Sequence, residues 1–199
     1  MQQEACILNA DTKEYLSVYY GILKDMIYGM TTAKLGESIS DNFIAQRIPH
    51  HRAAIRMSEN ILKYTGDRTL QSIAAGIISE QTKSIENMQS IRRFCGEDIN
   101  CKQDLTAYKQ SMDQIMQTMF AEMASAAVGN NINCNFIREM IPHHKGAVRM
   151  SERTLRFPIC PELKPILEAI ITSQKRGIRQ MQELSARLGC GKEGGVCRN

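Results

Sequence analysis

Apolar side chains recur along this chain at helical spacing, in segments of more than twenty residues that short polar or glycine-containing stretches separate. The first segment, about residues 12–34, places Tyr19, Leu23, Met26 and Met30 at spacings of four, three and four. Residues at such spacings share one face of an α-helix, so the pattern predicts an amphipathic helix. The same reasoning predicts helices over about residues 41–64, 68–94, 104–128, 135–157 and 162–188.

Glycine, aspartate and proline mark the expected boundaries of these helices. Gly36 and Gly129 follow the first and fourth helices, where we expect glycine to end the helix in a left-handed conformation. Asp67 is predicted to cap the third helix. Pro49 and Pro142 lie inside the second and fifth, which are either kinked or restarted there; apolar spacing on both sides favours the kink. Six long helices with short connections predict an all-α, up-and-down bundle.

The chain also repeats itself at an offset of 93 residues. Phe43 to Leu62 aligns without gaps with Phe136 to Leu155, and twelve of the 20 aligned positions are identical. Repetition of this kind predicts two copies of one supersecondary unit. We therefore expect two three-helix repeats, over residues 10–97 and 101–190.

Composition narrows the possible partners. Hydrophobic residues make up 43% of the chain and charged residues 23%, which is typical of a globular protein and argues against disorder. The net charge is +4, but basic residues are scattered among acidic ones, so nucleic acid is not an expected partner. The apolar runs are too short to cross a bilayer, and no membrane span is expected.

Seven cysteines without CxxC spacing, several of them near helix ends, are typical of disulfides and of an oxidising compartment. We therefore expect a periplasmic or secreted protein, although no signal peptide is visible in this chain. If neighbouring helices alternate in direction, Cys95 should pair with Cys101 or Cys160, and Cys6 with a cysteine of its own end, because a bridge needs Cα atoms within about 7 Å. One cysteine must remain free.

The four histidines form two adjacent pairs, and the first histidine of each pair lies seven residues before a methionine: His50-His51 before Met57, and His143-His144 before Met150. At about 100° per residue, this first histidine shares a helix face with the methionine, and the second flanks that face. Buried methionines are usually core filler. Histidine pairs that recur in both copies beside a methionine nevertheless favour a metal site.

Imidazole and thioether together suit Cu(I) or Ag(I), whereas methionine is a poor ligand for zinc, magnesium or calcium. No organic cofactor is expected. Gln81 and Gln174, at equivalent positions, are expected to be structural or to hydrogen-bond the ligands. The predicted metal ligands are His50, His51, Met57, Met26, Met30 and Met88 in the first repeat, and Met140, His143, His144, Met150, Met119, Met123 and Met181 in the second.

The two copies differ at one important position. Arg47 stands where the second copy has Met140, three residues before His143. A guanidinium there removes a thioether and repels a metal ion, so the first site should be the weaker one.

The segment from Phe136 to Met150, together with the first-helix methionines and Gln174, Ile178 and Met181, resembles the domain-of-unknown-function family numbered three hundred and five, which includes CopM-like copper-binding proteins. This resemblance implies a ferritin-like helical fold, an extracytoplasmic location, and binding of Cu(I) or Ag(I) through histidine and methionine for metal tolerance. A copper-export or copper-carrier protein is then a candidate partner.

Two other function classes are weaker. A ferritin-like di-iron enzyme would need a glutamate three residues before a histidine, and a zinc hydrolase would need a His-Glu-x-x-His motif; the chain has neither. We therefore expect no catalytic residues and no enzymatic activity. A helical interaction module with a methionine-rich surface is a further alternative.

Overall fold

The computed structural model describes residues 7–191 of the chain. Within this range the chain forms six long α-helices and no strand. Their bounds are α1 Ala10–Thr31, α2 Ile39–Ile61, α3 Arg68–Cys95, α4 Lys102–Ala124, α5 Ile132–Thr154 and α6 Leu163–Leu188.

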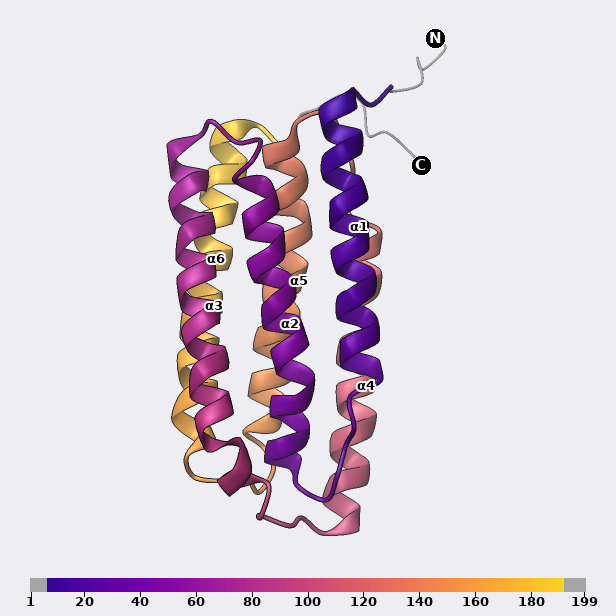
Figure 1. Cartoon of the computed structure of the whole chain (residues 1–199), viewed down its shortest axis with the longest axis vertical. Coiled ribbons are helices and arrows are strands. Elements are labelled where there is room, and N and C mark those ends of the chain that lie inside the picture. The colour runs from indigo at the N-terminus through magenta and orange to yellow at the C-terminus, as the bar shows by residue number, and fades with distance from the viewer. Residues whose placement is uncertain (1–6, 192–199) are drawn as a thin grey trace.

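The helices form two layers of three, with α1, α2 and α3 in one layer and α4, α5 and α6 behind them (Figure 1). Helices that follow one another along the chain run in opposite directions, which confirms the expected all-α, up-and-down bundle. Contacts between the layers run from α2 to α5 at the centre and from α3 to α6 at one side. The middle helices α2 and α5 are therefore covered by neighbours, and their side chains form the centre of the molecule.

Helices α2 and α5 continue through their internal prolines, so the alternative of a helix that restarts there is wrong. Packing accommodates the proline in α2: a Cβ atom added to Gly29 of α1 would lie only 2.8 Å from Cβ of Pro49. Glycine at this position therefore permits the close approach of α1 to the proline.

Side chains cap five of the six helices at their first turn. Asp67 accepts a hydrogen bond from the amide of Leu70 at 2.9 Å, which confirms its predicted role at the start of α3. Asn131 does the same for Cys134 at the start of α5. Such acceptors satisfy amide groups that have no partner within the helix.

The prediction that Gly36 and Gly129 end helices in a left-handed conformation is wrong. Helix α1 ends at Thr31 and α4 at Ala124, and Gly189 is the sole residue with positive φ in the described range. Each of the two glycines is instead held by an asparagine side chain of the next helix, which accepts from the glycine N–H and donates to its carbonyl. Gly36 pairs in this way with Asn42 (2.7 and 3.0 Å), and Gly129 with Asn135 (3.0 and 2.7 Å).

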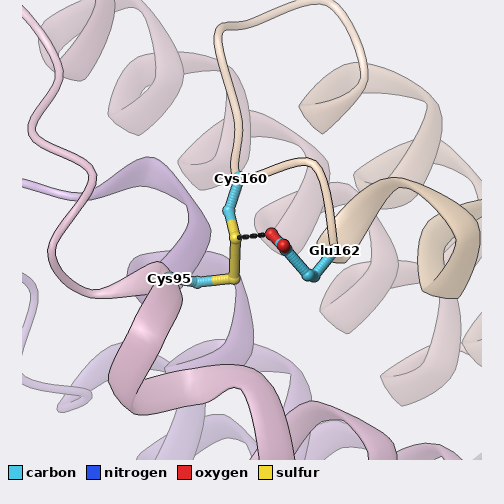
Figure 2. Close-up of side chains that lie close together, drawn as sticks. All are labelled: Cys95, Cys160 and Glu162. Atoms are coloured by element: carbon cyan, nitrogen blue, oxygen red, sulfur yellow. Dashed lines mark hydrogen bonds between the residues drawn. A yellow bond between two sulfur atoms is a disulfide. The ribbon is translucent and has the colours of Figure 1, made fainter.

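Among the described residues, two disulfides cross-link the bundle, one at each of its ends. Cys95 pairs with Cys160, as one of the two predicted alternatives, and Cys134 pairs with Cys190; the Cα–Cα distances are 5.3 and 5.4 Å. Figure 2 shows the first bridge, with the Glu162 carboxylate beside Cys160. Cys101 is free and exposed. The pairing predicted for Cys6 lies outside the described residues.

None of the six helices is both long enough and apolar enough to span a bilayer. The core consists mainly of aliphatic side chains and methionine, and every methionine from residue 26 to residue 181 is buried. This burial contradicts the alternative of a methionine-rich interaction surface. Flexible thioether side chains fill the space between facing helices instead of covering the outside.

Candidate metal centre

The four histidines lie at the middle of the central helices α2 and α5 and are essentially inaccessible to solvent. His50 and His143 are 0% exposed, His51 is 1% exposed and His144 is 2% exposed. The layers bring the pairs together because α2 packs directly on α5. The two histidine pairs, which are 93 positions apart in the sequence, therefore form one cluster.

His50 and His143 stack face to face across the boundary between the layers. Their ring centroids are 3.6 Å apart, and the planes are inclined by 29°. Nε2 of His50 lies 3.3 Å from the backbone carbonyl oxygen of His143, and Nε2 of His143 lies 3.1 Å from that of His50. If each ring carries its proton on Nε2, each donates to the other helix. This arrangement fixes both rings and directs Nδ1 away from the carbonyls.

The Nδ1 atoms are the unused ligand atoms of this cluster. In all four histidines Nδ1 is buried and has no hydrogen-bond partner in the described part of the chain. A buried nitrogen without a partner is costly unless something else binds it. The second histidines of the pairs differ at Nε2: that of His51 lies 2.9 Å from the Ser84 hydroxyl, whereas no hydrogen bond reaches His144 within residues 7–191.

Burial keeps these imidazoles neutral. Desolvation lowers the pKa of His50 and His143 well below the usual value, and the neighbouring histidines lower it further. It likewise lowers the pKa of His51, where the charge of Arg47 is the next cause, and reduces that of His144 to about 3. Neutral imidazole is the form that binds a metal ion, so the site is prepared for a metal without losing protons first.

Arg47 is the second unusual feature of this centre. Its side chain is 0% exposed, and Nε, Nη1 and Nη2 have no hydrogen-bond partner among the described residues. Burial lowers the pKa of Arg47 to about 9, so the guanidinium remains charged at neutral pH. This positive charge acts on all four histidines.

The predicted methionine ligands are all buried, and all six helices contribute them. Met26 and Met30 come from α1, Met57 from α2, Met88 from α3, Met119 and Met123 from α4, Met140 and Met150 from α5, and Met181 from α6; none is more than 2% exposed. Met119 lies directly against α5, because a Cβ atom added to Gly146 would be only 2.1 Å from its Sδ atom. Gly146 is three residues after His143, so Met119 contacts α5 about one helical turn from the histidine pair.

Histidine, cysteine and carboxylate side chains alone do not complete a metal site at the cluster. Among residues 7–191, the only three such groups that converge are Cys95, Cys160 and Glu162, where a disulfide occupies both sulfur atoms (Figure 2).

Several residues of the centre were not predicted from the sequence. Buried Glu139 accepts a hydrogen bond from the Tyr15 hydroxyl at 2.6 Å, and desolvation raises the pKa of its carboxyl to about 8. Ser84 and Gly177 hold equivalent positions in α3 and α6, next to His51 and His144 respectively. Because positions 84 and 177 are aligned by the 93-residue offset, the exchange of serine for glycine was the sequence signal that the surroundings of His51 and His144 differ.

The fold and the centre thus define an all-helical bundle with a buried cluster of imidazoles and thioethers. The chain belongs to the family described as "Domain of unknown function (DUF305)", whose pattern matches residues 40–185. This membership confirms the resemblance noted in the sequence. No curated protein matches the chain at a significant level.

Several solved structures are similar to this chain in sequence and fold. "CopM in the Cu(I)-bound form" is 27% identical, covers 75% of this chain and 96% of its own, and has a TM-score of 0.56. "CopM in the Ag-bound form (by soaking)" is 28% identical over 74% of this chain and 95% of its own, with a TM-score of 0.55. A DUF305 fragment from Deinococcus radiodurans, 24% identical, shares the fold over 75% of this chain and 96% of its own, with a TM-score of 0.55.

Proposed function

We propose that this protein binds the soft ions Cu(I) and Ag(I) through its central histidines and methionines, and thereby sequesters or buffers copper outside the cytoplasm. The observation that carries the proposal is the set of four buried imidazoles that are kept neutral, have unpartnered Nδ1 atoms and lie in a methionine-rich core. Similar structures named CopM are bound to Ag, Cu(I) and Cu(II), which supports the same class of cargo here.

The donor set favours soft ions for a physical reason. Imidazole accepts many divalent metals, but thioether sulfur binds Cu(I) and Ag(I) far better than hard or borderline ions. Because no third histidine, cysteine or carboxylate converges on the histidines within the described range, thioethers complete the coordination. The methionines therefore determine selectivity.

We infer one site per repeat, with the stronger site in the second. Met140 lies one helical turn before His143 and His144 in α5, whereas the equivalent position in α2 holds the charged Arg47. A fixed positive charge in a medium of low dielectric constant opposes the approach of a cation.

The disulfides support the proposed location. Cys95–Cys160 and Cys134–Cys190 are typical of proteins that fold in an oxidising compartment. In such a compartment these cysteines are not available to bind copper, and methionine and histidine remain as soft ligands. We infer a non-enzymatic role in metal tolerance, with a copper-export or copper-carrier protein as the exchange partner.

The central test is an anaerobic titration with Cu(I) and Ag(I), read by native mass spectrometry and by competition with a coloured chelator. The parent chain should bind two ions. Replacing Met57 and Met150 by leucine conserves apolar volume, so the fold should survive. This variant should lose at least tenfold in Cu(I) affinity while retaining weak Cu(II) or Zn(II) binding by histidine.

Met112→Leu is the matched control, because Met112 is equally buried in α4 but is not a predicted ligand. It should bind Cu(I) as the parent does. No bound ion in the parent chain would refute the proposed function. Parent-like affinity in the Met57→Leu/Met150→Leu variant would show that these two methionines are core filler.

Histidine substitutions test the difference between the repeats. Changing both His143 and His144 to alanine should remove more Cu(I) affinity than the same change at His50 and His51, since Met140 supports the former pair. Equal losses would show that the four histidines serve one shared site. The comparison separates two sites from one shared site because His50 and His143, one from each repeat, stack on each other.

A further inference from the structure

A cavity of about 240 Å³ lies between the outer helices α3 and α6. Side chains of these two helices form its walls, including exposed residues at its rim, and His144 is the only lining residue from a central helix. Among the four histidines, His144 alone lines this cavity. The cavity therefore connects the outside of the bundle with one member of the buried cluster.

Two glycines keep this space open. A Cβ atom added to Gly76 of α3 would meet nothing within 4 Å, so the wall is empty at this point. A Cβ atom at Gly177 of α6 would lie 2.9 Å from Cδ2 and 3.0 Å from Nε2 of His144. Any larger residue at Gly177 would press on the imidazole, so the glycine leaves the ring edge uncovered.

The equivalent contact in the first repeat is closed. Ser84 occupies the position that corresponds to Gly177, and its hydroxyl oxygen lies 2.9 Å from Nε2 of His51. No described hydrogen bond occupies Nε2 of His144. Nε2 of His51 is thus occupied by the Ser84 hydroxyl, whereas Nε2 of His144 is free to bind a metal ion that enters the cavity.

Polar groups without partners also line the cavity. Gln81 of α3 and Gln174 of α6 are each only 2% exposed, and the Oε1 atom of each is buried with no hydrogen-bond partner in the described range. The partial negative charge on these amide oxygens attracts a cation, but oxygen binds a soft ion only weakly, so the ion is not held there. An ion pair between Glu80 and Arg176 joins the two walls, and both side chains are about half exposed.

We propose that the cavity between α3 and α6 is the entrance through which a soft monovalent metal ion reaches the histidine cluster, and that His144 is the first protein ligand it meets. The ion passes the Gln81 and Gln174 oxygens and binds His144 before it reaches the inner imidazoles and thioethers. This inference rests on the proposed function and adds a route to it.

Loading kinetics test the route. Gly76→Leu fills the open space in the cavity wall without replacing a ligand. Transfer of Cu(I) from bicinchoninate, followed by stopped-flow absorbance, should become at least tenfold slower, while the final number of bound ions stays the same. Gly21→Leu is the matched control: Gly21 also lies within a helix and has nothing within 4 Å of an added Cβ, but it is exposed on α1. It should load at the parent rate.

The outcomes separate the route from the function. A parent chain that takes up no Cu(I) refutes the proposed function, and the route with it. A parent that loads, together with a Gly76→Leu variant that loads within twofold of the Gly21→Leu control, refutes the route alone.

A second measurement needs neither variant nor metal. Diethyl pyrocarbonate acylates accessible neutral imidazole, and mass spectrometry locates the product. In the unmodified protein, His144 should react at least fivefold faster than the other three histidines. Equal rates at all four would overturn the proposed entrance.

Discussion

Replacing Arg47 by methionine gives the first repeat the residue of the second, and should both stabilise the protein and strengthen its first metal site. The guanidinium is fully buried without a hydrogen-bond partner in the described range, and burial lowers its pKa to about 9. Burial lowers the pKa from 12.5 to about 9, and each unit corresponds to about 1.4 kcal/mol, so the buried charge costs on the order of 5 kcal/mol at pH 7. Methionine removes that cost and fills a similar length of core.

We expect the free energy of unfolding to increase by about 2–4 kcal/mol, since part of the gain is offset by imperfect repacking. Urea denaturation at pH 7 with intact disulfides measures this change. Arg52→Met is the control, because Arg52 is an exposed arginine of the same helix; its effect should stay within about 0.5 kcal/mol.

The same Arg47→Met variant should bind Cu(I) at its weaker site at least tenfold more tightly, which native mass spectrometry with chelator competition would show. Stability equal to or below that of the parent would refute the interpretation of Arg47 as an uncompensated buried charge. A stability gain without tighter binding would show that Arg47 does not oppose the metal.

Three further predictions concern the metal-free protein. The folded-state pKa of His50 and of His143 lies below the usual 6.5, so below that pH the unfolded chain binds more protons than the folded one. As the pH falls below 6.5, the free energy of unfolding should therefore decrease by up to about 1.4 kcal/mol per histidine per pH unit. In a His50→Gln/His143→Gln variant, the urea midpoint should depend less steeply on pH. The pKa of Glu139 is raised to about 8, so stability should fall as pH rises from 4.5 to 8, and Glu139→Gln should abolish this dependence. Gly146→Ala should cost about 1–3 kcal/mol by displacing Met119, with thermal melting unchanged if that contact is absent.

Local patterns predicted the elements of this fold well. Apolar spacing identified six helices, and its persistence on both sides of Pro49 and Pro142 argued against a restart there; both helices are continuous. Alternating helix directions restricted Cys95 to two partners, of which Cys160 is the observed one. The predicted ends of α1 and α4 are wrong, because glycine does not end either helix. The hydroxyls of Thr32 and Ser125 donate to the last turns of α1 and α4, and Asn42 and Asn135 hold the glycines in the loops that follow.

The sequence by itself determined which residues share a helix face, because the 3.6-residue period fixes directions within one helix. It therefore identified the His-His-Met units and the substitution at Arg47. Only the tertiary structure decided how two such faces meet. Packing of α2 on α5 stacks His50 on His143, and packing of α3 on α6 opens a cavity at His144. These relations depend on the registration of side chains between helices far apart in the sequence, and no periodicity within one helix encodes that registration.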